Sequence, residues 1–310
     1  MEMSDKKSSL KGFIVLSRLP FLLPGLAALV SGIGIGVLKD RNIDSGFVGL
    51  SILGLALIML ATYYFNEYFD YEGDIINRRF IKFSGGSRAL PDEMVPRRLA
   101  RIAGWGVVAV LVVIAVTYLI LYFKDYPLLL PMGLFGAFCG VFYSHPPFQW
   151  AYRGIGEILI GACYGVLPLV SGYYIASGVL DLRMVVIGIP ASITIFCVIV
   201  ANEFPDYDAD KAVNKRNLVV RLGLRRASRM YAVAMLLVYP FMLATMLVYP
   251  WPNVIFAGLP VLVLTVAAAT DALKGGYLQS DTQTKISGMT LLANLLSSLV
   301  FIVVFFRLEA

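Results

Sequence analysis

Histidine, cysteine and charged residues are scarce in this sequence of 310 residues, and their scarcity excludes several kinds of site. The one histidine, His145, rules out a multi-histidine metal centre. The three cysteines, Cys139, Cys163 and Cys197, fall inside apolar runs and lack Cys-x2-Cys spacing. Their number and spacing argue against a disulfide framework and against a zinc site. We therefore expect the cysteines to be packing residues.

Charged residues make up only 15% of the chain and hydrophobic residues make up 59%, whereas about a quarter of the residues in soluble domains are charged. Several apolar runs are long enough to cross a bilayer, and backbone amides in lipid must be satisfied within the segment, so the spans are helices. The sequence predicts an all-α, polytopic membrane protein, with a single transmembrane domain over residues 1–310 and about nine spans around a central cavity. The predicted spans are 12–38, 46–70, 97–123, 127–145, 153–176, 183–204, 226–249, 253–272 and 286–307.

Two similar polar motifs follow long apolar runs. Asn-Glu-Tyr-Phe-Asp-Tyr-Glu-Gly-Asp begins at residue 66 and Asn-Glu-Phe-Pro-Asp-Tyr-Asp-Ala-Asp begins at residue 202, with five identities over nine positions. The residues at four-residue spacing are Asn66, Asp70 and Asp74 in the first motif and Asn202, Asp206 and Asp210 in the second. This spacing places each trio near one face of a helix. Carboxylates at membrane depth are costly unless compensated, and oxygen ligands suit Mg²⁺ or Ca²⁺.

Lysine and arginine are unevenly distributed between the loops, which predicts the orientation of the chain. If the spans alternate in direction, most of the 26 basic residues fall on one side, at the N-terminus and after the second and sixth spans. The positive-inside rule makes this side cytoplasmic. We expect a multi-pass protein of the cell membrane with its N-terminus and the mouth of its site in the cytoplasm. The two motif helices then run the same way, as a parallel pseudo-repeat.

Basic residues and a Gly-Gly pair follow the motifs within a few turns. Acidic and basic clusters at one mouth suit a polyanion held through a metal, and Gly85 and Gly86 would let the backbone approach a phosphate. An apolar cavity below that phosphate fits an isoprenyl diphosphate, whose leaving group Mg²⁺ would neutralise. Aromatic faces would stabilise the allylic cation, although for any single ring ordinary packing is the more frequent role. The candidate rings are Tyr63, Tyr64, Tyr68, Phe69, Tyr71, Phe142, Tyr143 and Tyr164.

The motifs, together with three further segments, resemble the UbiA superfamily of intramembrane prenyltransferases, in particular its naphthoate-type, menaquinone-pathway branch. The two motifs match the family's Asn-x3-Asp-x3-Asp and Asp-x3-Asp patterns. The branch segments are matched by Gly-Gly-Ser-Arg at 85–88, by Phe-Tyr-Ser-His-Pro-Pro at 142–147 ahead of Arg-Gly-Ile-Gly-Glu at 153–157, and by a basic segment at 214–223. The chain departs from the pattern at Glu67, where Asp is frequent, and at Asn214 and Asn217, which replace Gly and Thr. Because Asn is the next best residue to Gly at a left-handed turn, we expect the loop geometry around residue 214 to survive.

The resemblance implies Mg²⁺-dependent transfer of an isoprenyl group to an aromatic acceptor within the membrane, with release of diphosphate. It implies that two Mg²⁺ ions are bound by Asp70, Asp74, Asp206 and Asp210, supported by Asn66 and Asn202. The expected diphosphate contacts are Arg78, Arg88, Lys211 and Lys215, with Arg18 of the first helix as a further candidate. Tyr143 is expected near the allylic carbon or the acceptor, and Ser144 at the bound substrate. No residue stands out as a general base for the acceptor.

Three other functions remain to be distinguished. A CDP-alcohol phosphotransferase would carry an Asp-Gly dipeptide, and this sequence has none. A cation-coupled transporter would place its carboxylates near the middle of the membrane, whereas these lie at predicted helix ends. Transfer of a geranylgeranyl group to a glycerol-phosphate lipid is the main alternative within the family. The expected partners are an isoprenyl diphosphate, a lipophilic or aromatic acceptor and the bilayer, and no nucleic acid.

Overall fold

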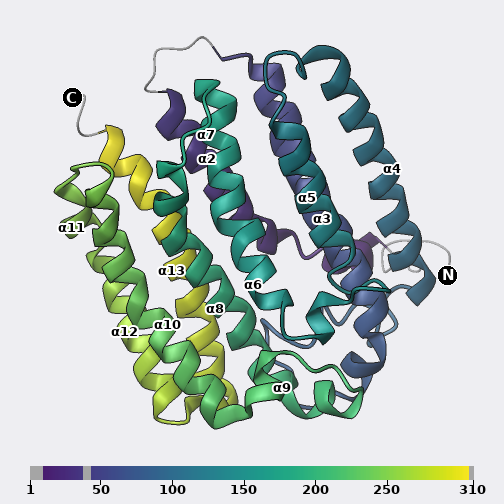
Figure 1. Cartoon of the computed structure of the whole chain (residues 1–310). Helices are drawn as coiled ribbons and strands as arrows, with labels where there is room; N and C mark the ends of the chain where they lie inside the picture. The colour runs from purple at the N-terminus through teal and green to yellow at the C-terminus, as the bar shows by residue number, and fades with distance from the viewer. Residues whose placement is uncertain (1–9, 38–42, 307–310) are drawn as a thin grey trace.

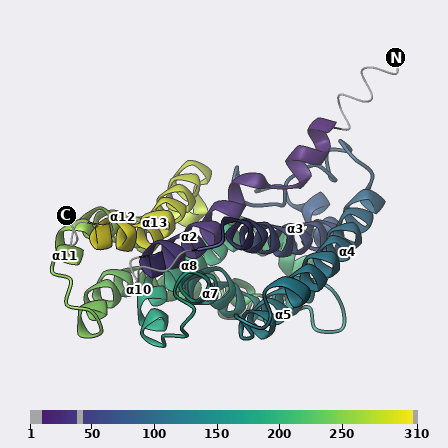
Figure 2. The same cartoon turned by 90° about the horizontal axis from the view of Figure 1, so that it is seen from above.

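The structure is a computed structural model that describes residues 10–37 and 43–306, except for the side chains of residues 305 and 306, and every regular element in this part of the chain is helical. The main helices lie side by side (Figure 1) and, seen from above, form a curved band with α3–α5 at one end and α10–α13 at the other (Figure 2). Their bounds are α2 Leu23–Val37, α3 Ser45–Ile76, α4 Arg97–Leu121, α5 Leu129–Val141, α6 Gly156–Gly161, α7 Leu167–Ser177, α8 Arg183–Ala212, α9 Leu218–Leu222, α10 Leu224–Ala244, α11 Asn253–Ala257, α12 Leu259–Leu273 and α13 Ser280–Phe306.

Seven helices among the described residues are long and apolar enough to cross a membrane, judged by length and composition. They include a continuous segment, Gly156–Ser177, in which α6 passes through a π-helical turn into α7. The predicted spans 127–145 and 253–272 correspond to α5 and α12, which have 13 and 15 residues, whereas a bilayer crossing takes about 20. Prolines at both ends limit α5, and Gly258 and Pro260 separate α11 from α12. The all-helical architecture is therefore confirmed, but the count of nine spans is not.

The two motif-bearing helices, α3 and α8, are the longest in the structure. The carboxylate of Asp44 caps the start of α3 by accepting hydrogen bonds from the backbone nitrogens of Gly46 and Phe47, at 2.7 and 3.3 Å. α8 continues past two internal prolines to Ala212. Both helices run in the same direction and end at the same edge of the bundle, near α9 (Figure 1). Both motifs therefore lie at this edge, which carries the site described below.

The two sides of the band differ in how completely side chains fill them. α2 and α7 touch through their backbones, since a Cβ atom on Gly172 would lie 2.1 Å from the backbone oxygen of Leu29. Between α8, α10, α12 and α13 the interior is filled by large buried side chains such as Phe204, Tyr231 and Met235. In contrast, α3, α4, α5, α6 and α7 surround an apolar cavity of about 310 Å³. The sequence predicted a central cavity, whereas this cavity is enclosed by the first part of the chain, from α2 to α7.

Candidate active site

A lysine from the loop after α8 joins the two acidic motifs. The Nζ atom of Lys215 lies 2.7 Å from Oδ2 of Asp70 on α3 and 3.6 Å from Oδ1 of Asp210 on α8. All three side chains are largely buried, with exposed fractions of 14% for the lysine and 8% for each aspartate. Burial alone would lower the pKa of Lys215, but the carboxylates of Asp210 and Asp70 outweigh it and hold the pKa well above its usual range. The ammonium group thus remains charged and neutralises carboxylates from both motifs.

Polar neighbours fix the orientation of each of these aspartates. The Tyr152 hydroxyl donates to Oδ1 of Asp70 at 2.8 Å, and burial together with the Asp70 charge raises the pKa of Tyr152, so the hydroxyl keeps its proton. The side-chain amide of Asn217 donates to Oδ2 of Asp210 at 2.7 Å, while its Oδ1 accepts from the backbone nitrogen of Val220 and caps α9. Asn217 therefore orders the loop and a site carboxylate at once.

The remaining two motif aspartates meet the loop that follows α3. The amide of Asn77 donates to Oδ1 of Asp206 at 2.7 Å, and the backbone nitrogen of Gly85 donates to Oδ2 at 3.3 Å. Gly86 has a φ of +68°, and a Cβ atom there would lie 2.3 Å from Oδ2 of Asp74. Only glycine permits this approach. The Gly-Gly pair, expected to let backbone approach a phosphate, thus first allows the loop to close over the carboxylates.

The two motif asparagines differ in their surroundings. The Ser144 hydroxyl donates to Oδ1 of Asn66 at 2.8 Å, which joins the start of the first motif to the segment after α5. The side-chain oxygen of Asn202 is buried and has no hydrogen-bond partner. A buried oxygen without a hydrogen-bond partner lowers the stability of the fold. Glu157 and Glu203 each have one carboxylate oxygen of this kind. The other carboxylate oxygen of Glu157 accepts from the backbone nitrogen of Leu218 at 2.6 Å.

The site offers a donor set that fits Mg²⁺. The predicted ligands, Asp70, Asp74, Asp206, Asp210 and Asn66, supply only carboxylate and amide oxygens, which this ion prefers. A cation, the Lys215 ammonium, already lies between carboxylates of the two motifs, so the space between them accommodates positive charge. In the described part of the chain no three acidic, histidine or cysteine side chains converge closely enough to hold a metal as they stand. A metal between Asp70 and Asp210 would therefore take the place of Lys215.

A second cavity, which we call the basic pocket, adjoins the acidic motifs. It has a volume of about 370 Å³, and its polar lining residues are Arg18, Lys82, Gly86, Ser87 and Arg88. Arg88 donates to the backbone oxygen of Asp74 at 2.6 Å. Arg18 lies 3.6 Å from the buried carboxylate of Glu67, which also accepts 2.7 Å hydrogen bonds from the backbone nitrogen and the hydroxyl of Ser87. Glu67 thus ties this loop and the turn at Arg18, which precedes α2, to α3.

The structure brings together most of the site residues that the sequence suggested. Arg18 and Arg88 line one pocket, Lys215 bridges the motifs, and Asn214 adopts the expected left-handed conformation with a φ of +57°. Arg78 and Lys211 have exposed side chains and lie at the rim. Sequence reasoning did not single out Tyr152, Asn77 or Lys82. These residues could have been found from their positions in the sequence, because they lie close to the motifs or to the Arg-Gly-Ile-Gly-Glu segment.

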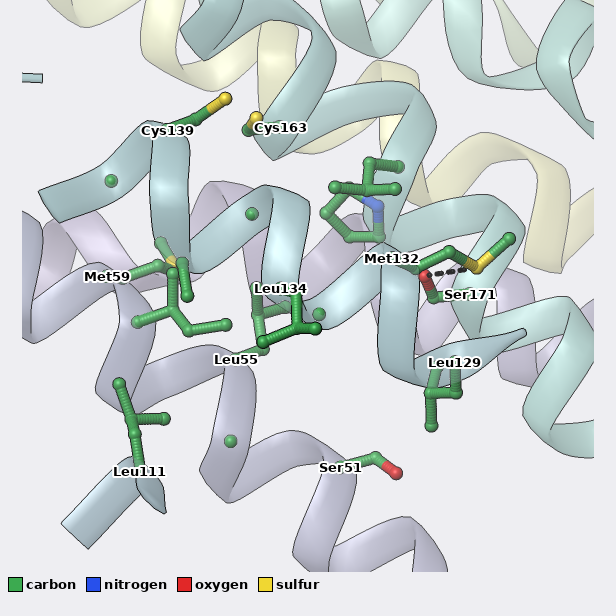
Figure 3. Close-up of a pocket in the computed structure, with 18 of the residues that line it drawn as sticks. Ser51, Leu55, Met59, Leu111, Leu129, Met132, Leu134, Cys139, Cys163 and Ser171 are labelled. Atoms are coloured by element: carbon green, nitrogen blue, oxygen red, sulfur yellow. Dashed lines mark hydrogen bonds between the residues drawn. The ribbon is translucent and has the colours of Figure 1, made fainter. Parts of the chain in front are cut away.

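The apolar cavity begins beside the polar site. Thr62 lines it one helical turn before Asn66, and Tyr143, next to Ser144, lines the same end. A Cβ atom on Gly156 would lie 2.8 Å from the Tyr143 ring, so this glycine of the Arg-Gly-Ile-Gly-Glu segment lets the ring pack there. Further along, Ser51, Leu55 and Met59 of α3 lie across from Leu129, Leu134 and Cys139 of α5 (Figure 3).

The histidine packs among aromatic rings, and the cysteines are buried, as the sequence predicted for the cysteines. His145 packs edge-on against Phe65, Phe69 and Trp105, with ring centroids 5.0 to 5.8 Å apart. All three cysteines are buried and free. Two of them, Cys139 and Cys163, line the apolar cavity.

Replacing the bridging lysine tests whether a cation is needed between the motifs. Lys215→Met leaves Asp70 and Asp210 buried without a counter-charge, which costs about 3–5 kcal/mol. We expect a lower melting temperature in EDTA than for the wild type, and a larger rise on adding Mg²⁺, because no ammonium competes with the metal. Thermal unfolding in detergent measures both. Lys211→Met, an exposed lysine of the same region, is the control. Equal Mg²⁺-induced shifts in the Lys215 variant and the wild type would contradict the exchange of cations.

Two of the known proteins to which the chain is similar are prenyl- or phytyltransferases that act on naphthoate or naphthoquinone compounds. The chain is 24% identical over 208 residues to the 1,4-dihydroxy-2-naphthoate octaprenyltransferase of Bacillus subtilis, and the match covers 66% of this chain and 64% of that protein. It is 28% identical over 144 residues to the 2-carboxy-1,4-naphthoquinone phytyltransferase of Synechocystis, covering 44% and 45% of the two chains. The chain thus spans less than two thirds of the length of these curated relatives.

Solved structures share the fold. A UbiA homolog from Archaeoglobus fulgidus bound to GPP and Mg²⁺ has a TM-score of 0.62 at 16% identity, covering 94% of this chain and 99% of that one. A digeranylgeranylglyceryl phosphate synthase has a TM-score of 0.60 at 19% identity, covering 96% and 99%. At these identities the likeness concerns the fold. The model of the UbiA prenyltransferase family matches residues 22–303, nearly the whole chain, and the protein therefore belongs to that family.

Proposed function

We propose that this protein transfers an isoprenyl group from an isoprenyl diphosphate to an aromatic, naphthoate-type acceptor within the membrane and releases diphosphate. The observation that carries the proposal is the meeting of three features at one edge of the bundle. Acidic motifs from two helices, a basic pocket and the Thr62–Tyr143 end of an apolar cavity adjoin one another there. The names of the relatives from Bacillus subtilis and Synechocystis support a naphthoate-type acceptor.

Mg²⁺ is the cofactor in this proposal, and the fold neighbour bound to GPP and Mg²⁺ supports that choice. We assign Asp70, Asp74, Asp206, Asp210 and Asn66 to hold it, as two ions. Bound Mg²⁺ supplies positive charge that offsets the charge of the leaving diphosphate. Tyr152 and Asn217 orient Asp70 and Asp210 for this role through the hydrogen bonds described above.

The basic pocket supplies the remaining contacts to the diphosphate. Arg18 and Arg88 present guanidinium groups, which suit phosphate oxygens, and the neighbouring Gly86–Ser87 backbone closes the loop over the acidic motifs. Lys215, once it leaves the carboxylates, can turn toward the same anion. Arg78 and Lys211 approach from the rim, and Asn202 supplies a side chain whose buried oxygen lacks a partner. The arginine and lysine side chains favour departure of the diphosphate because they stabilise negative charge as it develops.

Tyr143 and Ser144 occupy the junction between the polar site and the apolar cavity. We assign the tail of the donor to the cavity, where it excludes water, and the reacting carbon to the neighbourhood of the Tyr143 ring. An aromatic face stabilises an allylic cation there. The acceptor binds next to this carbon with Ser144 as a polar neighbour.

Transfer to a glycerol-phosphate lipid is the second candidate, supported by the fold neighbour that is a digeranylgeranylglyceryl phosphate synthase. Mass spectrometry of products formed from a panel of diphosphates with naphthoate and glycerol-phosphate acceptors distinguishes the two. We expect a prenylated aromatic product in Mg²⁺ and none in EDTA. Product formed only with the lipid acceptor overturns the aromatic assignment, and full activity in chelator overturns the metal assignment.

The acidic motifs act as one unit in this proposal, so their variants should be non-additive. We expect Asp70→Asn and Asp206→Asn each to lower kcat by about 10²- to 10³-fold, because leaving-group charge loses stabilisation. The double variant should be little slower than the worse single one. Steady-state transfer kinetics of purified variants measure this.

Asp208→Asn is the matched control, since this aspartate lies two residues from Asp206 on the same helix and its side chain is 71% exposed. It should keep wild-type kinetics. A folded Asp70→Asn or Asp206→Asn variant with near-normal transfer would rule out the assigned role.

The protein is an integral membrane protein, and we further propose that the N-terminus and the mouth of the site face the cytoplasm. The basic loops on this side support the orientation. Single cysteines placed at Arg78 and Lys211, both exposed, should react with an impermeant thiol reagent in inverted vesicles and resist it in intact cells. Labelling of either position in intact cells would reverse the assignment.

A further inference from the structure

We propose that the apolar cavity determines the length of the isoprenyl tail that the donor can carry. Phe47 and Tyr118 form the end wall of the cavity, and this wall limits the tail to roughly four or five isoprene units. The inference rests on the proposed function, since it assigns the length of the donor for the same site. It separates two tail classes found among the relatives' names, a phytyl group of four units and an octaprenyl group of eight.

The cavity follows one face of α3. The α3 residues that line it are spaced three or four apart, as one face of a helix requires; they include Phe47, Leu50, Ser51, Gly54, Leu55, Ile58, Met59 and Thr62. Thr62 at the polar end and Phe47 at the far end are 15 residue steps apart along the helix, which corresponds to about 22 Å of helix rise. A tail whose diphosphate lies at the acidic motifs must enter at Thr62 and Tyr143, because that is where the cavity meets the site.

Tightly packed aromatic side chains close the far end of the cavity. Phe47 is 1% exposed, and its ring lies 4.4 Å from the Tyr122 ring and 4.5 Å from the Tyr126 ring, measured between centroids. The Tyr118 hydroxyl donates to the backbone oxygen of Tyr126, and Tyr118 is 6% exposed. Asp44, the cap of α3, accepts a further hydrogen bond from Tyr122 at 3.1 Å. Residues from the end of α4 and from the α4–α5 connection therefore hold the end wall in place.

The length of the cavity sets the length of the tail. An extended chain advances by about 1.2 Å per main-chain bond, as fully extended polypeptide does. An isoprene unit has four such bonds, so one unit spans roughly 4.5–5 Å and a distance of about 22 Å holds four to five units. A longer tail would have to fold back or leave between helices into the lipid.

Two glycines keep the middle of the cavity wide. A Cβ atom on Gly133 of α5 would meet nothing within 4 Å, and one on Gly54 of α3 would come no closer than 3.8 Å to Ile114. Both residues line the cavity. A leucine at either position would therefore fit without disturbing the fold, and would project into the path of the tail about halfway along.

The experiment uses the full chain in detergent with Mg²⁺, a naphthoate-type acceptor and donors of two, three, four and eight isoprene units. We expect wild-type kcat/KM to be highest for the four-unit donor and lower by about tenfold or more for the eight-unit donor, the effect of overfilling a packed site. Gly54→Leu should reduce kcat/KM for the four-unit donor by about tenfold and leave the two-unit donor within about twofold. Phe47→Ala should raise kcat/KM for the eight-unit donor relative to the four-unit donor.

The control is Gly49→Leu, on the same helix, where the residue is exposed and a Cβ atom meets nothing within 4 Å. It should keep the wild-type length profile. Gly133→Leu blocks the cavity from the opposite wall and replaces Gly54→Leu if that variant does not fold. The melting-temperature shift that each diphosphate produces in Mg²⁺ gives a readout without turnover, and it should follow the same order.

The outcomes separate the two proposals. Transfer by the wild type with a length profile that neither blocking variant changes overturns the tail assignment and leaves the proposed function standing. Equal use of four- and eight-unit donors by the wild type overturns the end wall. A protein that transfers none of the donors to any acceptor overturns the proposed function, and the tail assignment with it.

Discussion

Carboxylates buried at the ends of two membrane helices need a compensating cation, and the architecture of the site depends on this requirement. An unpaired carboxylate in a low-dielectric environment costs several kcal/mol. Asp70 and Asp210 come from different helices and share one ammonium group, that of Lys215. Because the lysine belongs to the loop after α8, this charge sharing also fixes the loop over the site. The same two carboxylates that would bind a metal therefore hold the metal-free site together.

The loops complete the site by bringing hydrogen-bond donors to the carboxylates. Asn77 and Gly85 donate to Asp206, Tyr152 donates to Asp70, and Asn217 donates to Asp210. Glu67 anchors the opposite side of the first loop through Ser87. Asp70, Asp206 and Asp210 are thereby oriented before any ligand arrives, and such preorganisation makes charged groups effective in catalysis. The departures from the family pattern are compatible with this arrangement, since Asn214 takes the left-handed turn and Asn217 both caps α9 and binds Asp210.

The two ends of the helical band have different structural roles. Between α8, α10, α12 and α13 large buried side chains fill the interior, so this part supports α8 and presents the second motif. Around α3, α4, α5 and α7 the interior is left open as an apolar cavity. The pseudo-repeat in the sequence thus supplies two acidic helix ends to one site, while the body of the fold places the cavity on the side of the first motif. The acidic site and the apolar cavity adjoin at Thr62 and Tyr143. Because they adjoin, one molecule with a charged head and an apolar tail can occupy both.

What the sequence determined by itself is local. The low charge content and long apolar runs predicted membrane helices, and the four-residue spacing of Asn66, Asp70 and Asp74 predicted one helical face, because both follow from the period of a single helix. Helix lengths near prolines and glycines were less predictable, and α5 and α12 proved shorter than the expected spans. The contacts that make the site were decided by the tertiary structure. Asn77 meets Asp206 from 129 residues away and Lys215 meets Asp70 from 145 residues away, and no periodicity within one helix encodes such distances, because they depend on how whole helices pack.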